Sequence, residues 1–523
     1  MSGTAAGLAS PAAAAPSKAM GRDPNRGIIT ACVMLATVMN SLDTTIANVA
    51  LPHMQGSVQA SADQITWVLT SYIVAAAIMT PMTGWLAGRF GRKRVFMISI
   101  AGFTVASALC GAATSLAQIV GFRLLQGLFG AALIPLSQAV LMDIYAPEEQ
   151  GSAMAMWGMG AILGPIVGPA LGGFLTDDFS WRWVFYINLP FGVLAFLGVS
   201  AFIHDHKHED LAPIDLMGFG LLGLAIGAFQ LFLDRGESQA WFESSEIWIE
   251  AVTAALAAFL FTAHTLTADR PFLPRALFAD RNFISATVFG FFVGILLFST
   301  LALLPPMMEV LLGYPVVTTG IVSAPRGVGS WVAMFVVGRL VNRFDVRLII
   351  IAGLVTCFVA LTGMTHYSLT MDSGLIVWTG VVQGFGIGLI FVPLTILAFG
   401  TLNPVYRADG AGVFTLVRNL GSSAGISIMQ ALHTENTQVV HERLVSGLTL
   451  DNPLTRSLRA PFSLTNAAGA AALDGEANRQ ASMVAYVDDF KLMAVIALAL
   501  IPALLLMRKS RRAVSDEKHF VAD

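Results

Sequence analysis

Five ionisable side chains lie within long apolar segments of this 523-residue chain: Asp43, Arg123, Glu309, Arg326 and Arg418. A charge in a hydrocarbon environment costs at least about 2.5 to 3.5 kcal/mol, so it persists where something compensates it. Side chains placed in this way commonly take up and release protons or bind ionic ligands. These five residues are therefore the first candidates for a functional site.

Asp43 lies well inside the first apolar segment, where burial disfavours the charged carboxylate and favours proton uptake. Arg123, a permanent cation in the fourth segment, is its predicted partner. One hypothesis is a switch, in which protonated Asp43 releases Arg123, ionised Asp43 holds it, and each state favours a different arrangement of the helices. The alternative is a static pair that only fixes helix register.

The remaining three residues each leave two interpretations open. Glu309, near the end of its segment, is either a second site for a proton or a cationic drug, or a hydrated carboxylate at a helix end. Arg326 and Arg418 lie near the starts of their segments. Arg418, which precedes Asn419, either faces a cavity or, like Arg326, extends its long side chain to the membrane interface.

The amino-acid composition indicates that these residues belong to a membrane protein. Hydrophobic residues make up 55% of the chain and charged residues 12%, which is about half the charge of a soluble globular protein. Unbroken apolar runs of this length predict helices, because a β-barrel shows short alternating segments. We predict fourteen spans, near 28–50, 65–87, 95–112, 116–142, 153–176, 183–203, 214–233, 246–265, 283–308, 318–338, 347–366, 374–400, 409–432 and 488–507.

Basic residues cluster in loops on one side, whereas Arg182 and Arg235 are the basic residues of the short loops on the other side. The positive-inside rule therefore predicts that both termini are cytoplasmic. We predict a disordered cytoplasmic tail (1–27), an N-terminal six-helix bundle (28–203), two inserted transmembrane helices (214–265), a C-terminal six-helix bundle (283–507) with a long external loop (433–487), and a basic cytoplasmic tail (508–523).

The two bundles repeat each other. Gln126-Gly127 in the fourth span matches Gln383-Gly384 in the twelfth, and the GWLAGRFGR segment from Gly84 matches the GRLVNRFDVR segment from Gly338. In both cases the shift is eight spans. A duplicated six-helix unit with two helices inserted between the copies explains the pattern. Parallel repeats of this kind are typical of transporters that rock one bundle against the other.

Five motifs together resemble the major facilitator superfamily, and within it the fourteen-helix drug:proton antiporter family of the EmrB/QacA type. They are LDTTIANVALP (42–52), GWLAGRFGRKR (84–94), RLLQG (123–127), GPIVGPALGG (164–173) and WRWVFYINLP (181–190). The resemblance covers the whole membrane part. It implies a proton-coupling role for Asp43 and Arg123, and an antiporter motif comprising Gly164, Pro165, Gly168, Pro169, Gly172 and Gly173.

The resemblance also implies a cytoplasmic gating loop comprising Gly84, Arg89, Gly91 and Arg92. This chain departs from the family pattern at Gly88, where the loop usually has an Asp. The charge relay between that Asp and nearby arginines is therefore in question, and Arg89 and Arg92 are expected to act mainly as orientation and gating charges.

The 34 Phe and 22 Met residues supply soft apolar surface for a cavity that accepts varied lipophilic compounds. The residues that we predict for this cavity are Gln126, Trp157, Gln383, Arg418 and Asn419. The three cysteines lie in separate apolar segments, so neither a disulfide framework nor a thiolate metal site is expected. The net charge of −3 and dispersed basic residues give no basis for binding nucleic acid.

No phosphate-binding Gly-x-x-x-x-Gly-Lys-Ser/Thr loop occurs in the sequence, so we expect an ion gradient, the proton motive force, and no cofactor or metal. The resemblance implies a bacterial inner-membrane drug exporter that exchanges lipophilic toxic compounds for protons. It further implies a periplasmic adaptor of the EmrA type and an outer-membrane channel as partners, with 433–487 as one contact surface. The alternatives are a proton-coupled uptake carrier for a specific small molecule and an integral membrane enzyme.

Overall fold

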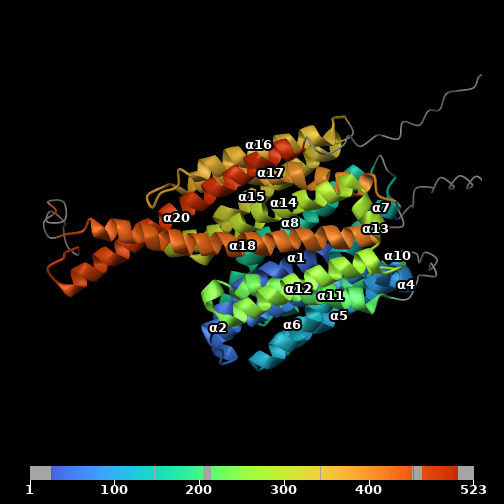
Figure 1. The fold of residues 1–523 in the computed structure, drawn as a ribbon, viewed down its shortest axis with the longest axis horizontal. Helices are drawn as coiled ribbons and strands as arrows, with labels where there is room; N and C mark the ends of the chain where they lie inside the picture. Colours follow the sequence, from blue (N-terminus) through green and yellow to red (C-terminus); the bar gives the residue numbers. More distant parts are fainter. Residues whose placement is uncertain are drawn as a thin grey trace, which may run out of the picture.

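The computed structural model describes residues 25–146, 149–203, 214–341, 343–403, 406–449, 452 and 462–504. The described residues form helices and connecting turns, without a β-strand, which confirms the all-α prediction (Figure 1). Most of the predicted N-terminal tail and the whole basic C-terminal tail (508–523) lie outside the described residues.

Six long helical segments make up the first bundle. They are α1 (Arg26–Ser57), α3 with η1 and α4 (Trp67–Met79, Thr80–Met82, Thr83–Phe90), α5 (Arg92–Ala112), α6 with α7 (Leu116–Gly130, Leu133–Ile144), α8 (Gln150–Asp178), and α9 with α10 (Trp183–Tyr186, Asn188–Phe202). A single turn, α2 (Ala62–Ile65), connects α1 to α3. Buried apolar side chains such as Met39, Phe96 and Phe103 fill the centre of this bundle.

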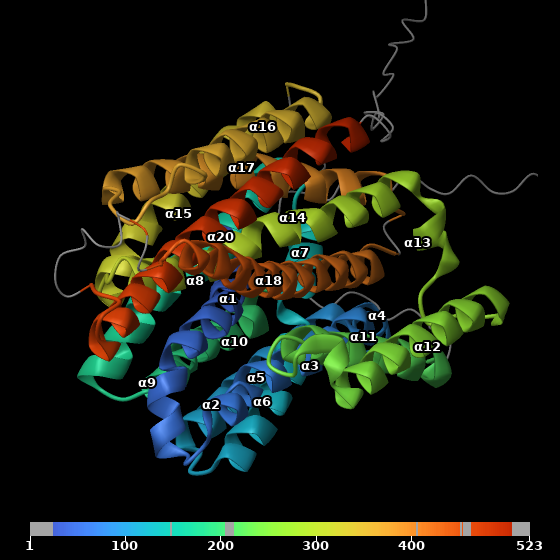
Figure 2. The same ribbon diagram turned by 60° about the vertical axis from the view of Figure 1, so that its left-hand side comes forward.

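The second bundle also has six long segments. They are α14 with η3 (Arg281–Pro306, Met307–Leu311), α15 (Val316–Leu340), α16 (Val346–Met364), α17 (Ser373–Gly400), α18 (Arg407–Ser446) and α20 (Ala467–Ala503). Between the bundles run α11 (Leu216–Arg235), η2 (Trp241–Glu243), α12 (Ser245–Thr267) and the short α13 (Arg275–Ala279). In Figure 2, α11 and α12 lie together on the side of the molecule where α3 lies, and α11 packs on α3.

Twelve of the described helical segments are long and apolar enough to cross a membrane. The helices α18 and α20 run alongside them at the positions of the last two of the fourteen predicted spans, but both are longer and more polar and neither belongs to the twelve. At 1.5 Å per residue, the 40 residues of α18 extend about 60 Å, twice the thickness of a hydrocarbon core.

We predicted the segment 433–487 as a polar external loop, but its described residues are largely helical; 450–451 and 453–461 lie outside the described residues. The helix α18 continues to Ser446, α20 begins at Ala467, and the two project together beyond the other helices (Figure 1). Polar and alanine-rich sequence forms helices readily, so low hydropathy did not imply irregular structure here.

Acidic and amide side chains define where several of these helices begin. Asp215, Asp280, Asp345, Asp372 and Asn466 each accept a hydrogen bond from a backbone N–H in the first turn of α11, α14, α16, α17 and α20. Such caps satisfy amide groups that have no partner within the helix. These caps define the residue at which each of the five helices begins, which the hydropathy of the apolar segments does not.

The two bundles contact each other through small residues. On α15, Gly320 faces Ala170 of α8, and Gly338 faces Ser152 near the other end of α8. At the end of the bundles where α4 lies, Gly84 packs directly against Asp409 of α18. A glycine is needed at position 84, because a Cβ there would overlap the Asp409 carboxylate and lie 2.7 Å from the Asp409 backbone nitrogen.

We therefore expect Gly84→Ala to separate α4 from α18 and open this end of the molecule. In a background without native cysteines, Thr83→Cys at the fully buried neighbouring position reports the opening. Its reaction with a water-soluble maleimide should accelerate at least about tenfold when Gly84 becomes Ala. Gly121→Ala, where a Cβ meets nothing within 4 Å, is the control. Equal labelling of the two variants would show that this contact does not close the end.

Candidate functional site

The carboxylate of Asp43 is completely buried and has partners on both oxygens. Its Oδ2 accepts a hydrogen bond from Nη1 of Arg123 at 2.6 Å. Its Oδ1 accepts from Nε2 of Gln126 at 2.8 Å and from Nδ2 of Asn188 at 2.9 Å. The structure thus brings the two residues of the predicted pair together, and it adds Gln126, which the sequence placed in the substrate cavity.

Arg123 is equally buried and is held from several sides. Its Nε donates to the carbonyl of Val68 at 3.0 Å, and its Nη1 also donates to Gln126 Oε1 at 2.8 Å. The guanidinium lies 4.5 Å from the ring centre of Tyr72 and 5.4 Å from that of Phe185, both cation–π distances.

The network extends through neutral polar side chains that sequence reasoning missed. Asn188 also donates to Ser107 Oγ at 3.0 Å, and Asn40 donates to the hydroxyl of Tyr72 at 2.9 Å. Asn188 lies inside the WRWVFYINLP motif, so an amide in an otherwise apolar segment was the signal that could have identified it. Three donors from α6 and α10 therefore converge on the Asp43 carboxylate through charge-assisted and neutral hydrogen bonds.

The predicted antiporter motif packs α8 onto α1 at the turn that carries Asp43. Gly164 faces the backbone of Ser41 and Leu42, and Gly168 faces Thr45. Two hydroxyl groups bridge the contact: Ser41 Oγ donates to the Ala161 carbonyl at 2.6 Å, and Thr45 Oγ1 donates to the Gly164 carbonyl at 3.1 Å. Of the other motif residues, Gly172 faces Ile46, whereas Pro165, Pro169 and Gly173 belong to the same helix.

Gly164→Ala should destabilise the protein by about 1 to 3 kcal/mol, because backbone atoms cannot move aside for the added methyl group. Its Cβ would lie 2.6 Å from the Leu42 backbone nitrogen. Gly160→Ala on the same helix is the matched control, since its Cβ would lie 3.3 Å from the flexible end of Met34. Denaturant unfolding of both variants checks the expectation. If Gly164→Ala behaves like the control, the close contact has no role.

In the predicted gating loop, Gly91 has a φ of +89°, a backbone conformation that would be strained in any residue with a Cβ. Arg92 forms an ion pair with Asp143 of α7, and Arg89 is exposed. At the departure from the family pattern, Gly88 provides no carboxylate, but Asp409 of α18 lies close to both Gly84 and Arg92. An acidic group is therefore present at this contact, from the other bundle.

Two predicted cavity residues from opposite bundles both contact Phe391. Trp157 of α8 donates to Thr37 Oγ1 at 3.0 Å and stacks on Phe391 of α17, with ring centres 5.9 Å apart. The guanidinium of Arg418 lies 5.4 Å from the centre of the same Phe391 ring. Its neighbour Asn419 is exposed.

The remaining predicted residues lie elsewhere in the second bundle. Gln383 is buried and donates to Thr300 Oγ1 at 2.9 Å. Arg326 is buried and donates to the Leu297 carbonyl at 3.2 Å. Glu309 lies half-buried in the π-helical turn η3, and the structure does not bring it to Asp43.

Sequence reasoning also missed two carboxylates, one fully buried and one half-buried. Asp489 of α20 is 1% exposed and lies 3.3 Å from Nδ1 of His433, whose ring packs against Tyr486. Asp234 near the end of α11 accepts a hydrogen bond from Gln230. Both lie at the edges of predicted spans, where sequence cannot distinguish a buried position from a hydrated one.

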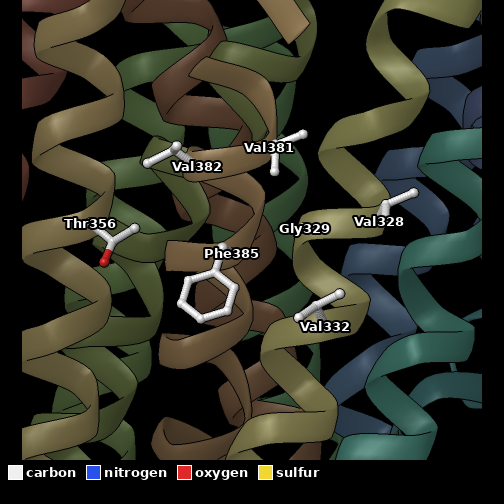
Figure 3. Close-up of a pocket in the computed structure, with 7 residues that line it drawn as sticks. All are labelled: Val328, Gly329, Val332, Thr356, Val381, Val382 and Phe385. Atoms are coloured by element: carbon white, nitrogen blue, oxygen red, sulfur yellow. The ribbon is translucent and has the colours of Figure 1, made fainter. Parts of the chain in front are cut away.

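No three metal-ligating side chains come together in the described part of the chain, and the three cysteines there are free. An open apolar hollow of about 320 Å³ lies between α15, α16 and α17, away from Asp43 (Figure 3). It is lined by Val328, Gly329, Val332, Thr356, Val381, Val382 and Phe385.

Comparison with known proteins places this geometry in context. Residues 33–426 match the family model described as Major Facilitator Superfamily. The chain is 35% identical to the multidrug export protein EmrB of Escherichia coli strain K12 over 82% of this chain and 85% of that protein. It is 36% identical to the fatty acid resistance protein FarB of Neisseria gonorrhoeae over 80% of this chain and 83% of that protein. The motifs had indicated EmrB in particular within the drug antiporter family, and this likeness bears out that prediction.

Solved structures agree on the fold. The proton:xylose symporter XylE superposes with a TM-score of 0.59 at 12% identity, covering 93% of this chain and 100% of that one. A bacterial homologue of the human lysosomal transporter Spinster gives a TM-score of 0.55 at 18% identity, covering 94% of this chain and 100% of that one.

Proposed function

The chain belongs to the Major Facilitator Superfamily, and from that premise we propose that this multi-pass membrane protein is a proton-coupled exporter of lipophilic toxic compounds. The observation that carries the proposal is the buried pair of Asp43 and Arg123, with α8 packed closely on the same turn of α1. The proton motive force supplies the energy, without a cofactor.

The coupling follows from the two protonation states of Asp43. Ionised Asp43 binds Arg123, Gln126 and Asn188, which holds α1, α6 and α10 together. A proton on the carboxylate removes the charge that organises these donors, so α1 can shift against α8. The arrangement of the bundles thereby depends on the proton, and a proton that enters from one side and leaves on the other can drive the cycle.

The substrate class is proposed from the surface between the bundles and from the relatives. Trp157 and Phe391 stack across the interface, and Arg418 lies beside them. Gln126 contacts Asp43 itself, which would link substrate binding to protonation. The names of the relatives concern multidrug export and fatty acid resistance, so we propose varied lipophilic compounds as substrates.

We also propose a bacterial inner membrane as the location, with both termini in the cytoplasm, as the loop charges predict. In that orientation the projecting parts of α18 and α20 are periplasmic. They would serve as one contact surface for a membrane-fusion adaptor of the EmrA type, which in turn would join an outer-membrane channel.

Purified protein in liposomes tests the function. A lipophilic fluorescent dye and a trapped pH indicator measure dye and proton fluxes together. A proton gradient should drive the dye uphill in the direction opposite to the protons, and an uncoupler should abolish the movement. Dye flux in the same direction as protons would favour the uptake carrier, and flux without proton movement would contradict proton coupling.

A further inference from the structure

The inserted helix α11 contacts both bundles at once. Ala77 of α3, Ile226 of α11 and Leu416 of α18 form one buried apolar cluster. Ser427 Oγ of α18 donates to the Leu233 carbonyl of α11 at 2.7 Å. Any movement of α3 relative to α18 must therefore break or shift contacts of α11.

Next to these contacts lies the carboxylate of Asp234. Its Oδ1 accepts a hydrogen bond from Gln230 Nε2 at 2.9 Å, and the hydroxyl of Thr70 on α3 is within reach of the same carboxylate. The same Gln230 nitrogen donates to Ser423 Oγ of α18 at 2.9 Å. The Oδ2 atom is buried and has no hydrogen-bond partner among the described atoms. The Gln230 amide thus links the carboxylate on α11 to the second bundle.

The charged side chains around Asp234 are engaged with other partners. Arg235 pairs with Glu246 at 2.6 Å and Glu250 at 3.1 Å on α12, and it lies over the ring of Trp67. Glu237 accepts a hydrogen bond from Thr434 of α18.

The side chains of α3 and α18 that contact Asp234 or its hydrogen-bonded neighbour Gln230 are neutral. On α3 the nearest polar group is Thr70, and on α18 the facing groups are Ser423 and Ser427. The charged or titratable groups on either side along α18 have other contacts: Arg418 lies over the Phe391 ring, and His433 pairs with Asp489. Among the described residues, Asp234 therefore lacks the cationic partner that Asp43 has in Arg123.

We propose that Asp234 is a second proton-binding site, and that α11 uses it to couple proton binding to the contact between the two bundles. An ionised carboxylate without a cation is costly while α11 is sealed between α3 and α18. The closed contact therefore favours the protonated, neutral acid. Opening the contact admits water, which stabilises the ionised form, so proton release and opening favour each other.

This inference rests on the proposed proton-coupled export. It adds a function for the inserted helix α11, which takes no part in the Asp43–Arg123 pair. It predicts two different defects. Loss of Asp43 should abolish coupling altogether. Loss of Asp234 should leave coupled transport in place with fewer protons exchanged per dye molecule.

The test measures the number of protons exchanged per dye molecule in liposomes. A dye gradient is set against known membrane voltages and pH gradients, and the conditions at which net dye flux stops give this proton-to-dye ratio. Asp234→Asn should lower this ratio by about one while transport continues. Asp178→Asn, at an exposed position on α8, is the matched control and should leave the ratio unchanged. A ratio in Asp234→Asn equal to that of the control would overturn the proposal.

Hydrogen exchange provides a measurement that does not depend on transport. Between pH 8 and pH 6, backbone protection of 226–234 and 416–428 should rise in the native chain and stay constant in Asp234→Asn. Ser423→Ala keeps the carboxylate but removes its link to α18, so it should lose the pH response of 416–428 and keep the native proton ratio. If the native chain shows no proton-driven dye flux, the proposed function fails, whereas unchanged protection across this pH range refutes the role of Asp234 itself.

Discussion

Asp43→Asn is expected to abolish proton-driven export, lowering uphill dye transport at least about 100-fold. The amide cannot alternate between a charged and a neutral state, so a proton gradient no longer distinguishes the two arrangements of the bundles. The substitution preserves size and hydrogen-bonding groups in a network built by Arg123, Gln126 and Asn188. Dye flux under a proton gradient, measured in liposomes, gives the result directly.

The comparison that isolates coupling is downhill dye exchange without a proton gradient. This exchange should persist in Asp43→Asn if the variant still changes between its two arrangements. Asp177→Asn, an exposed Asp on α8, controls for the loss of a carboxylate in general. Native-like uphill transport by Asp43→Asn would refute the coupling role and leave the static ion pair as the better explanation.

Arg123→Leu should destabilise the folded protein by about 3 to 5 kcal/mol near neutral pH, because it leaves the buried Asp43 charge without a cation. The carboxylate is 0% exposed, so water cannot replace the guanidinium. The loss should shrink as the pH falls, since protonation of Asp43 removes the uncompensated charge. Denaturant unfolding in detergent micelles at several pH values measures both the loss and its pH dependence.

The double variant Asp43→Asn with Arg123→Leu separates the unpaired charge from the lost packing. It should recover most of the stability that Arg123→Leu loses and show little pH dependence, because no buried charge remains. It should still fail to couple transport to protons. A double variant as unstable as Arg123→Leu would mean that contacts with Tyr72 and Val68, not the charge, dominate the contribution of Arg123.

The membrane architecture followed from the sequence alone. Long apolar runs and sparse charge require spanning helices, and the repeated motifs required two related bundles with two helices between them. The same reasoning identified Asp43 and Arg123, because a buried acid and a buried permanent cation in one bundle each need compensation. These conclusions depend on amino-acid composition and on the free-energy cost of placing a charge in a membrane, and both can be read from the sequence.

The tertiary structure decided which neutral groups complete the site and what the inserted helices touch. Asn188 and Gln126 bond to Asp43 across three helices, and Gln230 joins Asp234 to Ser423. An amide or hydroxyl in an apolar run costs little enough to occur without a function, so its type does not reveal its partner. The helical extensions of α18 and α20 were also hidden, since hydropathy reports burial in a membrane and not helix formation in water. Rotation and register of packed helices decide these contacts, and close packing of small residues such as Gly84 and Gly164 fixes both.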